Sequence, residues 1–269
     1  MRIISLVPSC TEILFYLGLG DQLVGVTANC DFPLEVRHKE QVGYFSSPNI
    51  PKIISMKPDL VISGGEIHRE HGDQLHKAGI DLLDFDPLTI DALLDGMVEL
   101  LYRTGLPVNT GRVDLLKMKR GSIEAEFSHM GIRRPRLAFV LGEGTLAAPG
   151  PANCQYDALK ICGALPMPSA RNDSFMLITW ENVAAFNPEI ILACGCGPDE
   201  KPRRRCPGCT VEKRSCARDI VDVKRNPSLS NVIAVMRGRV YAVPCHFFCR
   251  PGPRLFQGME WLAGLIKQL

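Results

Sequence analysis

The stretch Ile3-Ile4-Ser5-Leu6-Val7-Pro8-Ser9-Cys10-Thr11-Glu12 opens the chain and decides its fold class. Residues 2–7 form a short apolar run, which predicts a buried strand that ends at the proline. Ser9 and Glu12 have the spacing of a capping box, so we expect a helix that begins there and runs to Gly18. A strand, a tight loop and a helix in this order predict an α/β fold with a polar loop at the strand's carboxyl end.

The chain contains a weak internal repeat. Lys57-Pro58-Asp59-Leu60-Val61-Ile62 and Asn187-Pro188-Glu189-Ile190-Ile191-Leu192 share one form, a proline and an acid followed by three aliphatic residues. Each hexapeptide predicts a buried strand within its own strand–helix series. Other strands are expected at residues 23–26, 80–85, 136–141 and 239–243. The repeat therefore predicts two similar α/β lobes.

A long polar-rich stretch separates the two series. Its apolar residues lie at roughly helical spacing, which predicts one helix with a single buried stripe made of Val113, Leu116, Ile123, Phe127 and Met130. We therefore expect two Rossmann-like lobes joined by a long backbone helix, with a ligand cleft between the lobes. The expected boundaries are residues 1–104 for the first lobe, 105–131 for the connecting helix and 132–269 for the second lobe.

A cysteine-rich insert at residues 194–218 interrupts the second series. Five thiols fall within 23 residues and two more follow soon after, giving the set Cys194, Cys196, Cys206, Cys209, Cys216, Cys245 and Cys249. The insert has few large apolar side chains, so burial cannot order it, and disulfides, a structural zinc or an iron–sulfur cluster are the candidates.

The spacing of these thiols bears on which metal they would hold. Cys206 and Cys209 suit a zinc knuckle, but seven thiols exceed one tetrahedral site, and Cys-x-Cys beside Cys-x2-Cys also suits iron–sulfur ligation. We expect an iron–sulfur cluster of the four-iron, four-sulfur type, with zinc and redox or disulfide use as alternatives. Cys194 and Cys245 each follow a predicted parallel strand, so both should emerge at one sheet edge, where ligands bind.

The composition excludes several classes of protein. The chain has 269 residues, 46% of them hydrophobic, and a formal net charge of +2, which is too balanced for a nucleic-acid partner. It has no run of 18 apolar residues, so no membrane insertion is expected. The apolar run before Pro8 is too short for a signal peptide, and this predicts a cytoplasmic protein. An odd number of cysteines, 11, in a reducing compartment favours metal over disulfides.

Taken together, several motifs resemble one known family, the class III substrate-binding proteins with a helical backbone, and in particular their cobalamin-binding branch. The motifs are Ile3–Leu14, Val24–Thr27, Cys30–Pro33, Lys57–Val61, Asn187–Ile191, Gly238–Val243 and Arg250–Leu255. The resemblance covers nearly the whole chain. It implies two rigid lobes, a connecting helix, and a small-molecule or metal-complex ligand held at the strand carboxyl ends. The cysteine-rich insert, Cys245 and Cys249 depart from the family pattern.

Candidate ligand-binding residues lie where loops should follow strands or where aromatic side chains gather. They are Ser9, Cys10, Cys30, Tyr44, Phe45, Glu66, Glu143, Trp180, His246, Phe247 and Arg250. The cysteines could instead be buried inert thiols, about half of the aromatic residues could be core, and Glu143 could be a loop cap. His246 could bind a cluster or a corrinoid cobalt, or form an ordinary hydrogen bond. Glu66, His68 and His71 have ligand-like spacing, but we favour an exposed polar turn.

These expectations combine into one main hypothesis and two alternatives. The main hypothesis is a cytosolic cobalamin or corrinoid-type binding protein that carries an iron–sulfur cluster at the cleft. One alternative is an iron–sulfur redox protein or enzyme that reuses the binding fold and has a redox partner. The other is the substrate-binding component of an ABC importer, with an ABC permease as partner and a structural zinc loop. The sequence shows no nucleophile–base pair and no phosphate loop, so binding or electron transfer is expected rather than catalysis.

Overall fold

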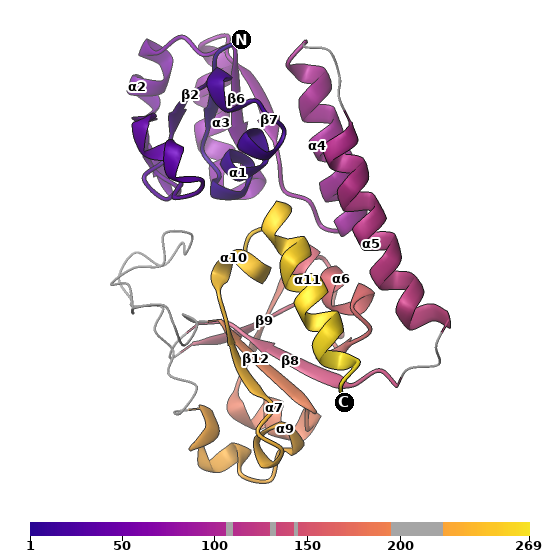
Figure 1. Ribbon diagram of the computed structural model, residues 1–269. Helices are drawn as coiled ribbons and strands as arrows, with labels where there is room; N and C mark the ends of the chain where they lie inside the picture. The colour runs from indigo at the N-terminus through magenta and orange to yellow at the C-terminus, as the bar shows by residue number, and fades with distance from the viewer. Residues whose placement is uncertain (106–109, 130–132, 143–144, 195–222) are drawn as a thin grey trace. The chain divides into compact units, whose positions relative to one another are not determined.

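The computed structural model describes residues 1–105, 110–129, 133–142, 145–194 and 223–269 (Figure 1). These residues form two compact units. Unit 1 contains residues 1–87 and 94–115, and unit 2 contains residues 88–93 together with the described residues from 116 onward. Each unit is built on its own parallel sheet. The prediction of a two-lobed α/β fold is confirmed, while the exact boundaries at residues 104 and 131 remain a prediction.

Unit 1 is organised around a five-stranded sheet of order β3-β2-β1-β6-β7, in which every pair is parallel. Its strands are β1 (Ile3–Ser5), β2 (Leu23–Val26), β3 (Glu40–Gln41), β6 (Leu60–Ser63) and β7 (Asp81–Asp84), and β4 (Gly43–Tyr44) pairs with β5 (Ser47–Pro48) beside it. Its helices are α1 (Pro8–Tyr16), α2 (Ile50–Ser55) and α3 (Arg69–Lys77), with 3₁₀ turns at Gly20–Gln22, Leu34–His38 and Gly65–His68. The central strands β1 and β6 are fully buried, as expected for a sheet covered on both faces.

Helix α1 begins earlier than the sequence suggested. Its first residue is Pro8, its N-cap is Val7, and no side chain caps it. The predicted capping box of Ser9 and Glu12 is therefore wrong. The reason is that proline is well suited to the first helical position, where its fixed φ fits the helix and its missing N–H costs nothing. Ser9 consequently lies inside the helix and is buried.

Unit 2 contains a four-stranded parallel sheet of order β10-β8-β12-β13. Its strands are β8 (Arg136–Val140), β10 (Leu165–Pro166), β12 (Ile190–Cys194) and β13 (Val240–Val243), and β9 (Leu146–Pro149) pairs with β11 (Phe175–Ile178) in an antiparallel ribbon. Its helices are α6 (Cys154–Ile161), α7 (Trp180–Phe186), α9 (Ile233–Met236), α10 (Cys245–Phe248) and α11 (Pro253–Ile266), with a 3₁₀ turn at Pro227–Leu229.

Two longer helices, α4 (Ile90–Arg103) and α5 (Gly111–His129), lie between the two strand–helix series in the chain. Four of the five predicted stripe residues of α5 are buried, and the fifth, Met130, is outside the described residues. Within unit 2, ion pairs join α5 to α11: Lys119 to Glu260 and Lys267 to Glu126, each at 2.8 Å.

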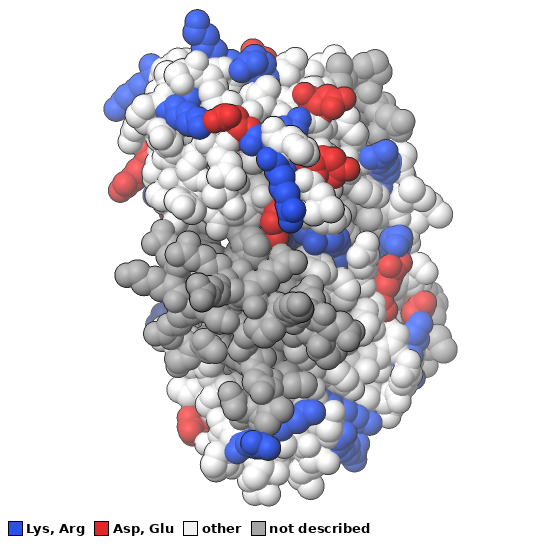
Figure 2. Space-filling model, turned by 60° about the vertical axis from the view of Figure 1, so that its left-hand side comes forward, with Lys and Arg blue, Asp and Glu red and all other residues white. Residues whose placement is uncertain are grey.

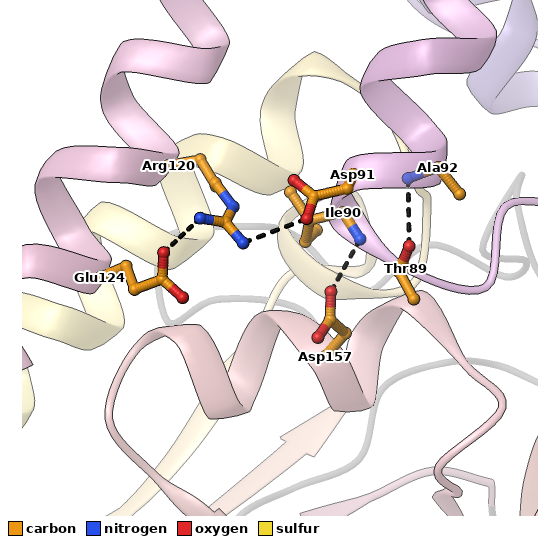
Figure 3. A network of polar contacts seen from close by, with 7 residues as sticks. All are labelled: Thr89, Ile90, Asp91, Ala92, Arg120, Glu124 and Asp157. Carbon is orange, nitrogen blue, oxygen red and sulfur yellow. Dashed lines mark hydrogen bonds and ion pairs between the residues drawn. The ribbon is translucent and has the colours of Figure 1, made fainter. Parts of the chain in front are cut away.

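Within unit 2, a polar network holds the first turn of α4 (Figure 3). The Ile90 N–H donates to Asp157 Oδ2 on α6 over 2.8 Å, which satisfies one of the amide groups that a helix start leaves without a partner. Arg120 on α5 pairs with Asp91 at 3.1 Å and also with Glu124. A carboxylate at a helix start is stabilised by the helix dipole as well. The network fixes the position where the chain enters α4.

The internal repeat extends to individual hydrogen bonds. In unit 1, Lys57 ends the segment after α2 with a φ of 47°, in the left-handed region. Arg2 donates its side chain to the Lys57 carbonyl over 3.3 Å, and its N–H donates to Asp59 Oδ2 over 2.6 Å. The Asp59 N–H in turn donates to the Arg2 carbonyl over 2.9 Å. This corner aligns the starts of β1 and β6.

Unit 2 contains the same corner in different residues. Asn187 ends α7 with a φ of 49°, and Arg136 donates Nε to its carbonyl over 2.9 Å. The Arg136 N–H donates to Glu189 Oε2 over 3.1 Å, and the Glu189 N–H donates to the Arg136 carbonyl over 2.8 Å. The two hexapeptides therefore enter their sheets through one shared geometry.

Candidate functional site

The candidate site in unit 1 is built from the loops that follow its parallel strands, because ligands of open α/β sheets bind at strand carboxyl ends. The loop after β2 carries Cys30, which is buried. The Thr11 hydroxyl donates to Cys30 Sγ over 3.0 Å, and Thr27 Oγ1 lies 3.4 Å from the same sulfur. Cys10, inside α1, is also fully buried, and this burial raises the pKa of its thiol. Both cysteines are buried within unit 1, and their role in ligand binding stays a prediction.

His68 connects two of these loops. It is buried, and Gly64, which follows β6, donates its N–H to His68 Nδ1 over 2.8 Å. Because Nδ1 accepts a hydrogen bond, Nε2 carries the proton and donates to the Phe45 carbonyl over 2.6 Å. Burial lowers the pKa of His68, and the neighbouring His71 lowers it further. Both ring nitrogens are used within the protein, so His68 is a structural link between loops rather than a metal ligand.

The interpretation of residues 66–71 as an exposed polar turn is thus wrong for His68, although it fits Glu66. Glu66 is exposed and pairs with Arg69. The reason for the difference is the 3₁₀ turn Gly65–His68, which directs His68 inward toward Phe45. The rings of Phe45 and His68 meet edge to face with centroids 5.1 Å apart.

Two further residues of this edge were not among the sequence candidates. Asn29 accepts the Phe45 N–H over 2.8 Å and so fixes the turn that presents Tyr44, which is 54% exposed. Asp86 follows β7 and lies beside Gly65, whose φ is 61°. Desolvation raises the pKa of Asp86, and the nearby Asp84 adds to the effect. A search for polar residues after every predicted strand, rather than for known motifs, would have found Asn29 and Asp86.

In unit 2, three sulfur atoms meet at the carboxyl edge of the sheet. Cys194 is the last residue of β12 and pairs in register with Val243 of β13, two residues before Cys245. Cys194 Sγ lies 3.2 Å from Cys245 Sγ and 3.4 Å from Cys249 Sγ. All three sulfurs lie within 4.8 Å of one another, and all three residues are partly exposed.

The other predicted residues of unit 2 are more dispersed. His246 and Phe247 form an edge-to-face pair with ring centroids 4.9 Å apart, and both are partly exposed. Arg250 is buried, and Trp180 at the start of α7 packs partly against the core of unit 2. Glu143 and four of the predicted metal ligands, Cys196, Cys206, Cys209 and Cys216, lie outside the described residues.

Comparison with known proteins identifies the family of this chain. The sequence profile of the periplasmic binding protein family matches residues 3–245. The chain belongs to that family. It is 29% identical over 272 residues to an uncharacterized ABC transporter substrate-binding lipoprotein of Bacillus subtilis, covering 98% of this chain and 79% of the relative. It is 28% identical over 199 residues to a vitamin B12-binding protein of Photorhabdus laumondii, covering 72% of this chain and 71% of the relative.

Solved structures of the family share the two-lobed architecture. The periplasmic vitamin B12 binding protein of Vibrio cholerae superposes with a TM-score of 0.78 at 21% identity, covering 99% of this chain and 96% of that one. The periplasmic heme-binding protein from Roseiflexus sp. RS-1 gives a TM-score of 0.74 at 22% identity, covering 99% and 98%. At these identities the likeness establishes the fold of this family member.

The comparisons correct two expectations. The cytoplasmic location is wrong, because the relatives are periplasmic proteins or a lipoprotein; the N-terminal residues and the thiol count gave no information on the compartment. The iron–sulfur cluster, and with it the iron–sulfur redox protein or enzyme, is wrong as well, because the relatives are named for vitamin B12 or heme. The ABC substrate-binding alternative fits the findings better.

Two further features of the described part of the chain are its helix lengths and its surface charge. In the part of the chain that the structure describes, no helix is both long and apolar enough to cross a membrane. Basic and acidic side chains occur near one another across the described part of the face in Figure 2, in line with the formal net charge of +2.

Proposed function

We propose that this protein is the substrate-binding component of an ABC importer, and that its ligand is a corrinoid of the cobalamin class. The observation that carries the proposal is the 28% identity, over 72% of the chain, to proteins named vitamin B12-binding protein in Photorhabdus laumondii and Salmonella typhimurium. The Bacillus subtilis relative, described as an ABC transporter substrate-binding lipoprotein, supports the transport role and a permease partner.

The exposed groups at the sheet edges supply the contacts that such a ligand needs. A corrinoid offers a broad apolar face with amide groups at its rim, so aromatic side chains should cover the face while polar loop groups bind the rim. In unit 1, the exposed ring of Tyr44 is the leading candidate, since Asn29 and His68 hold the adjacent residue Phe45 in place. In unit 2, Trp180, His246 and Phe247 are candidates of the same kind.

A direct binding measurement tests this function. We would titrate the purified full-length chain with cyanocobalamin by isothermal calorimetry, with hemin in a parallel titration. We expect saturable binding of cobalamin with one ligand per chain, and a Tyr44→Ala variant that binds about tenfold more weakly, which corresponds to about 1.4 kcal/mol. Tyr102→Ala is the matched control, because Tyr102 is also exposed but lies on α4.

Two outcomes would contradict the proposed ligand, and a third would contradict the role given to Tyr44. Cobalamin that produces no heat and no spectral change at high concentration would exclude a corrinoid ligand. Saturable binding of hemin alone would assign the protein to the heme-binding members of the family. Equal effects of the Tyr44 and Tyr102 substitutions would remove Tyr44 from the ligand site.

A further inference from the structure

Three cysteines of unit 2 form a compact group that the proposed transport function does not require. Cys194 ends β12, whereas Cys245 and Cys249 lie at the two ends of the single turn α10. We propose that these three thiols bind one thiophilic, closed-shell divalent metal ion of the zinc class. The site is a feature of unit 2 and does not depend on which ligand the importer carries.

The distances suit such an ion. Thiolate sulfurs bound to zinc lie about 2.3 Å from the metal, so two of them in a tetrahedral site are about 3.8 Å apart. The sulfur of Cys194 is 3.2 Å from that of Cys245 and 3.4 Å from that of Cys249, and no pair exceeds 4.8 Å. The separations of Cys194 from Cys245 and from Cys249 are each about half an ångström shorter than this ideal spacing.

The backbone that carries the thiols is firmly held. Cys249 N–H donates to the Cys245 carbonyl over 2.7 Å, so these two residues lie one helical turn apart with side chains on the same face. Phe248, between them in the turn, is fully buried and meets Phe139 of β8 edge to face at 5.8 Å. A ligand set on rigid elements loses little entropy when it binds a metal.

Contact with the last helix fixes the same turn from its other side. A Cβ atom at Gly258 of α11 would come within 2.6 Å of the Phe247 carbonyl oxygen, so only glycine allows this close approach. Since the β12–β13 register places Cys194 beside the end of β13, all three thiols are positioned by sheet and helix packing.

The remaining described cysteines differ from this group in accessibility. Cys10, Cys154 and Cys162 are buried, and burial raises the pKa of each thiol, which disfavours the thiolate that binds metal. The three thiols of the proposed site are partly exposed, so a metal ion can reach them. Three protein ligands leave a fourth tetrahedral position for water or another donor.

A disulfide is the competing use of these thiols, since the family's relatives act outside the cytoplasm, where disulfides persist. Cys194 and Cys245 are close enough for one after a small movement, because a disulfide needs a sulfur separation of about 2.0 Å. A disulfide within this group would use two of the three sulfurs, whereas a metal ion uses all three. The geometry of three mutually close sulfurs therefore favours the metal.

The test uses a variant of the whole chain in which the four cysteines outside the described residues are replaced by serine. The substitutions are Cys196→Ser, Cys206→Ser, Cys209→Ser and Cys216→Ser. The protein is purified with a chelator and a non-thiol reductant and then titrated with Zn²⁺, Co²⁺ and Cd²⁺. We expect one ion per chain, sulfur-to-metal charge-transfer bands with Co²⁺ and Cd²⁺, and an X-ray absorption shell of three sulfurs at about 2.3 Å from zinc.

Further substitution in that background identifies the ligands. Cys194→Ser and Cys249→Ser should each weaken zinc binding at least tenfold and reduce the sulfur shell to two. Cys162→Ser is the matched control, because Cys162 is buried and donates to the Met259 carbonyl over 3.4 Å, a bond that serine can keep; it should leave zinc affinity unchanged. Circular dichroism confirms that each variant is folded.

Several results would overturn the proposal. One is a folded, reduced protein of the fourfold background that binds no zinc, or that binds it with fewer than three sulfurs. Another is unchanged zinc affinity after substitution of Cys194 or Cys249. A third is a native disulfide between two of the three thiols, found by mass spectrometry of the parent chain isolated without reductant, that persists when the protein is prepared with zinc.

Discussion

Replacing His68 by leucine should lower the free energy of unfolding, because the neutral ring of His68 links two loops by hydrogen bonds. The substitution removes the hydrogen bonds from the Gly64 N–H, at 2.8 Å, and to the Phe45 carbonyl, at 2.6 Å. Each lost bond costs about 1 kcal/mol, and a backbone group left buried without its partner costs about 1–3 kcal/mol. Since leucine retains much of the buried volume, we expect a total loss of about 2–4 kcal/mol.

The contribution of His68 should also depend on pH. Burial lowers the folded-state pKa of His68 below its ordinary value of 6.5, so below pH 6.5 the unfolded chain binds more protons than the folded chain. Stability from the neutral ring is therefore complete above pH 6.5 and declines as the pH falls toward the folded pKa. The slope cannot exceed about 1.4 kcal/mol per pH unit for one proton.

Urea denaturation of the parent and His68→Leu chains between pH 5 and pH 8 measures both effects. His76→Leu is the control: His76 lies on the exposed part of α3, and its substitution should change the unfolding free energy by less than about 0.5 kcal/mol. The reasoning is refuted if the two variants are equally stable at pH 8, or if the difference between parent and His68→Leu grows on acidification.

Two paired substitutions test the packing of the fold by thermal and urea denaturation. Glu189→Ala should lower the free energy of unfolding by about 2–3 kcal/mol, because loss of the buried carboxylate leaves a strand N–H without its partner. Asp59→Ala, at an exposed carboxylate, should lower it by about 1 kcal/mol. Equal losses would show that burial does not set the difference. Gly163→Ala, at a φ of 82° with the Phe127 ring 2.3 Å from the new Cβ, should cost more than 2 kcal/mol, whereas Gly79→Ala, at a φ of 74° in open space, should cost about 1 kcal/mol. A Gly163 variant no worse than the Gly79 variant would mean that Phe127 moves aside freely.

The sequence was sufficient to predict the architecture because the decisive signals are local. An apolar strand followed at once by a helix, and a repeated proline-acid-aliphatic hexapeptide, each fix an element without long-range contacts. The start of α1 was placed wrongly because two start signals competed, and the proline at the first position prevailed over the capping box of Ser9 and Glu12. The two possible helix starts differ by only one or two residues, and differences of this size are the hardest to predict at the end of a helix.

The candidate site was only partly predictable. Counting strand ends brings Cys194 and Cys245 to one sheet edge, as the structure shows, because parallel strands all point the same way. The same method could not place His68, whose burial depends on the turn that precedes α3 and on a carbonyl group 23 residues away. The prediction of an iron–sulfur cluster is wrong, because the spacing of thiols in a sequence does not distinguish one metal from another.

The repeated corner allows the carboxyl ends of β6 and β12 to be compared position by position. The two corners can be aligned through their shared hydrogen bonds, Lys57-Pro58-Asp59 with Asn187-Pro188-Glu189. In this alignment Gly64 and Cys194 are equivalent positions, each at the carboxyl end of its strand. In unit 1 the backbone at this position binds a neutral imidazole, which links two loops without adding charge. In unit 2 the same position carries a thiol that meets two others. The same strand-entry corner is thus followed by different contacts at the carboxyl ends of β6 and β12. We therefore expect removal of the proposed metal to speed hydrogen exchange at the Cys249 amide of unit 2, and acidification to speed it at the Gly64 amide of unit 1.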